Sequence, residues 1–337
     1  MTNGHGDDRH LYPGTTILHD FSSNVPPCPD HSKLWEHLTL HHDIISRYPE
    51  PEPYSLEEQI AQKYGVNPKS VLVTNGATEA IFLVAHFLMC KHSAIVQPTF
   101  SEYLDAASLF QHTTEIIASP YSIHPQTQAV WCCNPNNPTG QTWEHDRLLE
   151  SIDQNPNTIF IFDQSYYSFT PKPVLSHTEI CSRPNVVAIF SLTKKYALPG
   201  LRIGYLVTSE KRADEIRKLR MPWSVNALAI EAGQYLLHRD TFWKLDTLLS
   251  ERERVVTLLR EKTDIEIYPT DTHYFLAKLP NHTTAQELKD WLVQHYGILI
   301  RNADNFPTLT PQHIRIAIQS PEDNNQLIKA LTEWSQL

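Results

Sequence analysis

The stretch SLTKKYALPGLRIGY at residues 191–205 decides the fold of this chain. It follows the apolar run VVAIF at 186–190, whose length and β-branched residues are typical of a buried strand. Ser191 and Lys194 therefore stand at the carboxyl end of a strand, where open α/β sheets bind their ligands. We expect a ligand site at this edge of the sheet.

Short apolar strands alternate with helices before this stretch. Such an alternation, with turn residues at the strand ends, predicts a mostly parallel sheet with helices on both faces. The expected strands are residues 70–74, 93–97, 129–133, 158–162 and 186–190, and the expected helices are residues 55–64, 78–89, 103–110 and 145–152.

The C-terminal part follows a different pattern, with a long helical region at 211–261 and then a mixed set of elements that predicts a second, smaller α+β domain. The expected elements are strand 274–279, helix 285–296 ended by Gly297, strands 298–301 and 314–319, and helix 321–334. The expected division is an irregular N-terminal arm at 1–40 that belongs with the small domain, a large domain at 41–240 and a small domain at 241–337.

Composition excludes several classes of function. The 337 residues carry a net charge of −10, which disfavours binding to nucleic acid or to an anionic membrane. The longest apolar run, Ala80–Cys90, has about half of the roughly 20 residues that span a bilayer. The polar, acidic start predicts no signal peptide, and five sparse cysteines favour a reducing compartment, so we expect a cytoplasmic protein. Because the sequence has no HExxH motif, we expect no metal site.

Polar clusters follow four of the expected strands. They are NGAT at 75–78, NPNNPTG at 134–140, DQSY at 163–166 and SLTK at 191–194. Since the carboxyl ends of parallel strands meet at one edge of a sheet, the four clusters predict one shared site.

The runs NPNNPTG, DQSY and SLTKKYALPGLRIGY resemble the pyridoxal-phosphate (PLP) enzymes of fold type I, the class I/II aminotransferase family. Within that family the chain is most similar to threonine-phosphate decarboxylases and histidinol-phosphate aminotransferases, and the likeness extends from RYPEPEP at 47–53 to IRIA at 314–317. The pattern SLTK-x-YA-x-PGLR-x-GY looks most like the decarboxylases. The resemblance implies PLP as cofactor and the α/β fold of a PLP-dependent transferase.

The resemblance assigns Lys194 as the lysine that binds the cofactor covalently. In the family an arginine follows this lysine by eight residues, and Arg202 is eight residues after Lys194 but seven after Lys195. Lys195 is then expected to be structural or to face solvent. A partly desolvated setting with nearby cations should lower the pKa of the Lys194 amine, which must be neutral to react.

Four further residues match the family's contacts with the cofactor ring. Asp163 corresponds to the carboxylate that keeps the ring nitrogen protonated. Tyr166 and Asn137 correspond to the partners of the ring 3′-oxygen, and Tyr103 to the aromatic that stacks on the ring. Asn134 comes too early in its motif and is expected to stabilise a turn.

The cofactor phosphate is expected at the start of the helix after the first strand, because free N–H groups and the helix dipole favour an anion there. Its expected ligands are Gly76, Ala77, Thr78, Ser191 and Arg202. Tyr48 resembles a tyrosine that reaches the phosphate of the neighbouring subunit, which implies a homodimer with shared active sites.

Three residues are expected at the substrate. Arg315 corresponds to the arginine that holds the α-carboxylate, and Arg301 resembles a second arginine of members with phosphorylated substrates. His5 resembles part of a His-Gly motif that contacts substrate phosphate, but Asp7 and Asp8 follow where Gly and Asn are expected.

The resemblance leads to decarboxylation of L-threonine O-3-phosphate to (R)-1-aminopropan-2-yl phosphate, used in cobalamin biosynthesis. The alternative is an aminotransferase of the histidinol-phosphate type, because the two reactions differ only in which bond at Cα breaks. A non-catalytic module fused to a DNA-binding segment is disfavoured, since the first 40 residues are short and acidic.

Overall fold

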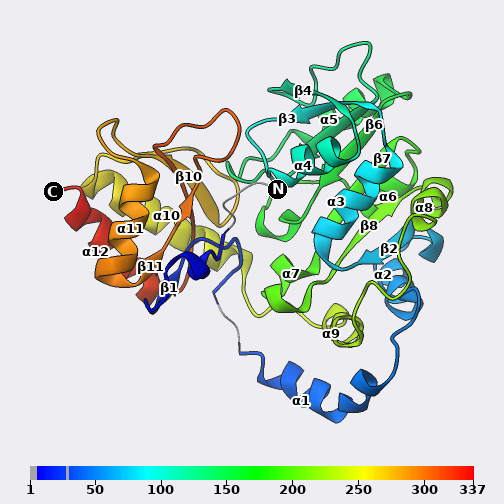
Figure 1. The fold of residues 1–337 in the computed structure, drawn as a ribbon, viewed down its shortest axis with the longest axis horizontal. Helices are drawn as coiled ribbons and strands as arrows, with labels where there is room; N and C mark the ends of the chain where they lie inside the picture. The colour runs from blue at the N-terminus through cyan, green and yellow to red at the C-terminus, as the bar shows by residue number, and fades with distance from the viewer. Residues whose placement is uncertain (1–5, 28–29) are drawn as a thin grey trace.

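The structure is a computed structural model that describes residues 6–27 and 30–337. Figure 1 shows a larger region on the right, built on a seven-stranded sheet, and a smaller region on the left. Among the described residues no helix is both long enough and apolar enough to cross a membrane.

The seven-stranded sheet has the order β2-β8-β7-β6-β5-β3-β4. The neighbours from β7 to β4 pair in parallel, and β8 is antiparallel to both β2 and β7, so the sheet is mostly parallel as predicted. The strands are β2 (Val71–Thr74), β3 (His92–Val96), β4 (Thr113–Ile117), β5 (Ala129–Cys133), β6 (Ile159–Asp163), β7 (Val186–Ser191) and β8 (Gly204–Thr208). The sequence pattern missed β4 and β8. Most side chains of β4, an edge strand, are exposed, and β8 begins inside the motif at 191–205.

Helices cover both faces of this sheet. Alternate residues of β7 enter opposite hydrophobic clusters, because side chains along a strand point to opposite faces: Val186 joins one cluster and Val187 the other. One face is covered by α2 (Tyr54–Tyr64), α5 (His145–Gln154), α6 (His177–Cys181) and α9 (Ala227–Leu237). The other is covered by α3 (Gly76–Phe87), α4 (Glu102–Leu109) and α8 (Glu210–Arg217).

The smaller region contains an antiparallel sheet of order β12-β13-β10-β9. Its elements are α10 (Leu245–Lys262), β9 (Glu266–Ile267), β10 (Tyr274–Lys278), α11 (Ala285–Tyr296), β11 (Ile298–Leu299), β12 (Arg301–Asn302), β13 (His313–Ala317) and α12 (Pro321–Trp334). Gly297 ends α11 with φ +63°, as predicted. The single strand expected at 298–301 is wrong, because β11 pairs with the N-terminal arm and β12 pairs with β13.

The N-terminal arm is more ordered than the sequence suggested. Strand β1 (His19–Asp20) pairs in parallel with β11, and helix α1 (Ser32–Leu40) packs Leu34 and Leu38 against α9 below the larger region (Figure 1). The arm therefore touches both regions, and the expectation of an irregular segment is wrong. The boundaries at 40 and 240 stay predictions.

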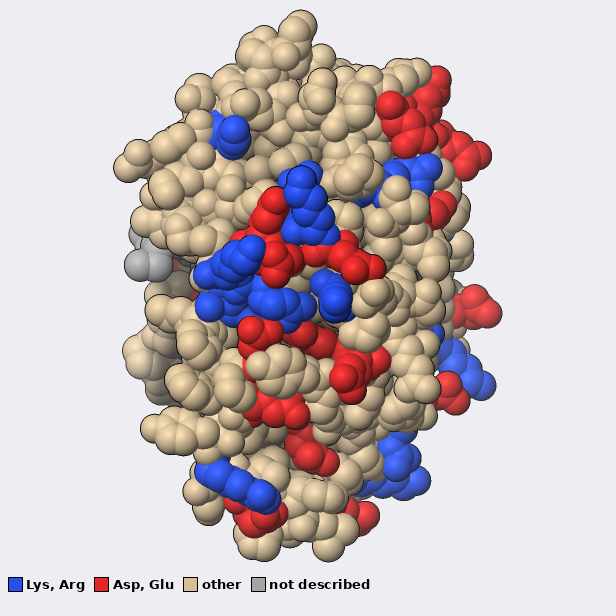
Figure 2. All heavy atoms as spheres, turned by 90° about the vertical axis from the view of Figure 1, so that its right-hand side faces the viewer, with Lys and Arg blue, Asp and Glu red and all other residues tan. Residues whose placement is uncertain are grey.

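Charged side chains are interspersed on the face that carries α8, where Lys and Arg lie among Asp and Glu (Figure 2). Arg217, the last residue of α8, and Arg220 each place Nη1 2.8 Å from a carboxylate oxygen of the buried Glu57. The run ERER at 251–254 alternates in sign, a pattern that predicts a solvated helix face, but it is only partly exposed. Arg252 is buried and donates to the carbonyl oxygen of Thr270 at 2.7 Å.

Candidate active site

A cavity lies at the carboxyl ends of the parallel strands, where four loops meet the N-terminal arm. Each of the four predicted clusters supplies side chains to its wall, so their convergence is confirmed. The predicted residues that line it are Ala77, Thr78, Tyr103, Asn137, Asp163, Tyr166, Ser191, Lys194, Arg202 and Arg315. Gly76 does not line the cavity but lies next to Arg202, which does.

One end of the cavity is suited to a phosphate group. The side chain of Asn75 makes no capping hydrogen bond to the first turn of α3, so N–H groups of that turn are available to an anion. Gly76 has φ +80°, and a Cβ there would lie 2.6 Å from Nη2 of Arg202. The backbone of Arg202 itself has φ +57°, which is unusual for a residue with a long side chain. In this conformation its guanidinium lies against Gly76 at the start of α3.

Asp163 ends β6, which lies between β5 and β7 and is therefore an internal strand. The carboxylate accepts hydrogen bonds from the hydroxyl of Tyr103 at 2.7 Å and from N–H of Ser165 at 2.9 Å. Burial raises the pKa of Asp163 above its usual range. A cationic partner in the cavity would stabilise this carboxylate, as a protonated ring nitrogen does.

Tyr103 is almost fully buried, and its ring stacks on Trp131 with centroids 5.8 Å apart. Its hydroxyl reaches Asp163 from the cavity wall. A role as stacking partner of the cofactor ring therefore stays a prediction, and the structure adds the contact with Asp163, which the sequence did not indicate.

Lys194 lies in the short helix α7 (Leu192–Lys195), directly after β7. Burial, followed by the nearby charges of Arg315 and Arg202, lowers the pKa of its amine to about 8. Its Nζ lies 6.0 Å from the ring centroid of Tyr166. Lys195 does not face solvent: its Nζ donates to the hydroxyl of Tyr167 at 3.2 Å, which is a structural contact away from the cavity.

Arg315 comes from β13 of the smaller region and is buried in the cavity wall. Its guanidinium donates to the side-chain oxygen of Asn137 and to the carbonyl oxygen of Ser22. The Nε atom has no hydrogen-bond partner within the described part of the chain. Arg315 therefore joins the arm to both regions and retains a donor for a ligand.

Arg301 sits opposite Arg315 in the register of β12 and β13 but is not among the residues that line the cavity. Its Nη2 donates to Oδ1 of Asn305 at 2.7 Å, and its guanidinium lies 5.3 Å from the ring centroid of Phe306. Burial and the neighbouring Arg315 lower the pKa of Arg301 to about 9. Its predicted contact with substrate phosphate stays a prediction.

The acidic pair that follows the His-Gly motif is neutralised by cations. Asp7 lies 2.6 Å from Nε of Arg9, and the buried Asp8 pairs with Lys289 of α11. The negative charges of Asp7 and Asp8 are thus paired with Arg9 and Lys289. His5 itself lies outside the described residues.

The arm also supplies residues that sequence reasoning missed. Ser22, Ser23 and Asn24 line the cavity, and Thr193 does so from α7. No motif marks residues 22–24, because they reach the cavity through the pairing of β1 with β11. Thr193 could have been found, since it stands one residue before the predicted lysine.

Tyr48 does not line this cavity. Its side chain is 86% exposed and lies 5.7 Å from the ring of Trp223. Trp223 is itself 49% exposed, so the two aromatic rings lie together at the surface.

The chemistry of the cavity fits PLP. An uncapped helix start with an arginine suits the phosphate, a buried carboxylate suits the protonated ring nitrogen, and an amine of lowered pKa suits covalent attachment. The unpaired Nε of Arg315 suits a substrate carboxylate.

Comparison with known proteins supports the same interpretation. Residues 16–331 match the family described as aminotransferase class I and II. A threonine-phosphate decarboxylase of Salmonella typhimurium is 33% identical over 335 residues, covering 93% of this chain and 90% of the relative. Histidinol-phosphate aminotransferase 2 of Pasteurella multocida is 28% identical over 345 residues, covering 95% and 91%. The crystal structure of L-threonine-O-3-phosphate decarboxylase from Porphyromonas gingivalis has a TM-score of 0.92 at 33% identity, covering 95% of this chain and 100% of that chain.

Proposed function

This chain belongs to the class I and II aminotransferase family, with the fold type I architecture that the sequence predicted, and on that premise we propose that it is a PLP-dependent L-threonine-O-3-phosphate decarboxylase. The product would be (R)-1-aminopropan-2-yl phosphate, for cobalamin biosynthesis. The observation that carries this choice is the likeness to threonine-phosphate decarboxylases over nearly the full length of both chains, in sequence and in structure.

When bound, PLP supplies an electron sink for the breaking of a bond at Cα of an amino acid. In the proposed reaction Asp163 keeps the ring nitrogen protonated, and the first turn of α3 with Arg202 anchors the phosphate. Arg315 holds the substrate carboxylate through its guanidinium. Lys194, whose pKa is lowered to about 8, can give or take a proton near neutral pH.

An aminotransferase of the histidinol-phosphate type is the second candidate. It is favoured by the Pasteurella multocida relative, which is similar over almost the whole chain. The same residues serve both reactions, because in each reaction the amino group of the substrate binds beside Lys194. The reactions differ in whether the Cα–carboxylate or the Cα–hydrogen bond is broken.

The test separates the two reactions by their co-substrate. Purified enzyme loaded with PLP is given threonine phosphate without any keto acid, and CO₂ release is measured. Sustained release over many turnovers supports decarboxylation. Activity only with histidinol phosphate and 2-oxoglutarate would replace the proposal with the aminotransferase.

We propose further that two chains form a homodimer with shared active sites. The support is that Tyr48 is exposed in the single chain beside the exposed Trp223 and does not line the cavity of its own chain. Sedimentation at micromolar concentration tests it: the expected species is a dimer, and Tyr48→Ala is expected to weaken PLP binding. A fully active monomer would contradict the proposal.

A further inference from the structure

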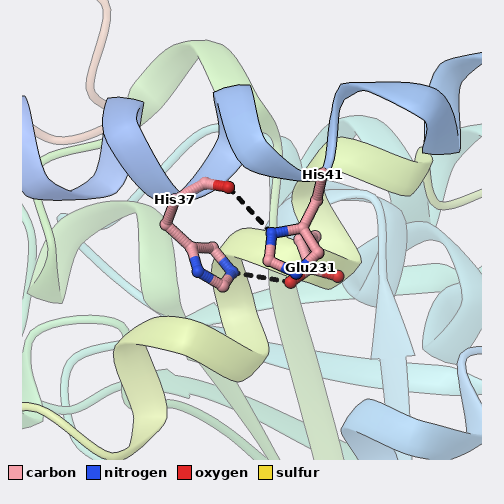
Figure 3. A group of neighbouring side chains, drawn as sticks. All are labelled: His37, His41 and Glu231. Atoms are coloured by element: carbon pink, nitrogen blue, oxygen red, sulfur yellow. Dashed lines mark hydrogen bonds and ion pairs between the residues drawn. The ribbon is translucent and has the colours of Figure 1, made fainter.

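Three side chains that can bind a metal gather where α1 meets α9, away from the active-site cavity (Figure 3). His37 and His41 are four residues apart at the end of α1, so the helical repeat places them on one face. Glu231 comes from α9, and its Oε1 lies 2.6 Å from Nε2 of His37. One potential ligand atom from each residue lies within 4.8 Å of the others.

The two imidazole rings are held in place by their neighbours. Nδ1 of His41 lies 2.8 Å from the carbonyl oxygen of His37, which can only accept, so Nδ1 carries the proton and Nε2 keeps its lone pair. The ring of His37 stacks on Tyr235, with centroids 4.3 Å apart. The hydroxyl of Tyr235 in turn donates to the carbonyl oxygen of Lys33, so the same residue also ties α9 to the start of α1.

We propose that His37, His41 and Glu231 bind a divalent transition-metal ion of the zinc type. Two imidazole nitrogens and one carboxylate oxygen are a ligand set that zinc prefers. A tetrahedral ion with bonds of about 2.0–2.1 Å needs its ligand atoms about 3.3 Å apart. The contact between His37 and Glu231 therefore has to open by less than about 1 Å, and the contacts of His41, which lie within 4.8 Å, have to close by up to about 1.5 Å. His41 is not fully buried, so water can take the fourth position.

The ion would bridge elements that are far apart in the sequence. Helix α1 is held to α9 by an apolar contact, in which Leu34 and Leu38 meet Ala232, and by the polar contact of His37 with Glu231. A bond through the metal would strengthen this polar contact and stabilise the arm on the larger region. None of the three ligands lines the active-site cavity, so the site is independent of the proposed function.

This inference departs from the expectation of no metal site. That expectation rested on the absence of an HExxH motif, and residues 1–40, which include His37, were expected to be irregular. Only the formation of α1 and its contact with α9 bring the three groups together.

The experiment titrates ZnCl₂ into the full-length, PLP-loaded enzyme after treatment with EDTA, and heat release is followed. We expect one tight equivalent per chain. Loss of an outer partner of a metal ligand costs about 10- to 100-fold in affinity, so loss of a ligand in His37→Ala or His41→Ala should cost at least about tenfold. Glu231→Gln, which preserves size and hydrogen bonding, should also weaken the binding.

His42→Ala is the matched control, because His42 is the next residue along the chain and lies outside the cluster. It should bind ZnCl₂ like the unmodified enzyme. ZnCl₂ should also raise the melting temperature of the unmodified enzyme and of His42→Ala, but not that of Glu231→Gln. This measurement tests the metal site even where a histidine variant fails to fold. Absence of a one-equivalent site, or affinity unchanged in His37→Ala and Glu231→Gln, would overturn the proposal.

Discussion

The two walls of the active-site cavity are built in different ways. The wall formed by the larger region takes its residues from the ends of adjacent strands and from the start of α3, so one continuous sheet sets their positions. The opposite wall combines Arg315 of β13 with Ser22 of the N-terminal arm. It depends on three segments docking together, and it is the wall expected to contact the substrate.

Under the proposed function, this difference places the contacts with the cofactor on a single sheet, whereas the contacts with the substrate depend on the docking of three segments. Arg315 is the joint, because its guanidinium bonds to Asn137 of the larger region and to Ser22 of the arm. Changes on the sheet wall should therefore remove the chemistry for every substrate. Changes on the assembled wall should affect only those substrates that carry the group which the changed residue contacts.

The largest effect is expected at Lys194. Lys194→Ala removes both the covalent link and a proton carrier; the second role alone is worth about 10²–10⁴-fold, so with both lost kcat should fall by about 10⁴-fold. Steady-state CO₂ release measures it. Lys195→Ala is the neighbouring control and should retain activity. Borohydride reduction followed by peptide mapping should find the label on Lys194; a label on Lys195 would refute the assignment.

Asp163 should give the next largest effect. Asp163→Asn removes the negative charge that keeps the ring nitrogen protonated, and kcat should drop by about 10²–10³-fold for phosphorylated and unphosphorylated substrates alike. Tyr103→Phe deletes only the hydroxyl that donates to the same carboxylate and should cost less. Equal losses in the two variants would show that the carboxylate acts only through its hydrogen bond.

The pair Arg315 and Arg301 tests the assembled wall. A charge-assisted hydrogen bond contributes about 1.5–3 kcal/mol, which corresponds to about 10- to 100-fold in kcat/KM. Arg315→Ala should lower kcat/KM by about that factor for threonine and threonine phosphate alike, since both carry the carboxylate. Arg301→Ala should do so for threonine phosphate only.

Arg301 gives the more decisive test of the two, because its guanidinium donates to Asn305 and it does not line the cavity. If Arg301 only anchors the loop that holds Asn305, Arg301→Ala should reduce stability and activity toward both substrates in parallel. Equal losses for threonine and its phosphate would thus remove Arg301 from the phosphate site.

The sequence predicted the sheet wall well for a physical reason. Asp163 and Lys194 each lie within three residues of a buried strand, so the local pattern that predicts the strand also predicts where these residues lie in the sheet. The elements with a clear hydrophobic periodicity were predicted equally well: helices 285–296 and 321–334 have the predicted bounds.

The assembled wall and the arm could not be predicted in the same way. Whether Arg301 reaches the cavity depends on the register of β12 with β13, and the position of Ser22 depends on the pairing of β1 with β11. Both are contacts between segments far apart in the chain. Helix α1 was missed although five of its nine residues are good helix formers, because it is short and follows a stretch with three prolines at 26, 27 and 29; it is stabilised by packing on α9.

The smallest expected effect concerns the pH dependence of the rate at which the enzyme binds PLP. Both walls contribute to it, since Arg315 and Arg202 both lie near Lys194. Burial and the cations Arg315 and Arg202 lower the pKa of Lys194 to about 8 from an ordinary 10.5. The amine reacts only when neutral, so the rate at which enzyme stripped of PLP takes it up should rise with pH and level off above pH 8. Between pH 8.5 and 9.5 the neutral fraction grows by about 1.3-fold for a pKa of about 8, against about ninefold for an ordinary lysine.

Stopped-flow absorbance after mixing stripped enzyme with PLP measures this profile. Arg315→Met removes the larger of the two cationic contributions, one that comes from the assembled wall, so it should move the midpoint to higher pH. Arg202→Met, on the sheet wall, should move it less. A ninefold rise between pH 8.5 and 9.5 in the unmodified enzyme would mean that burial does not lower the pKa of Lys194. An unchanged midpoint in Arg315→Met would instead assign the shift to the sheet wall alone, because removing a cation beside a neutral amine always favours its protonation.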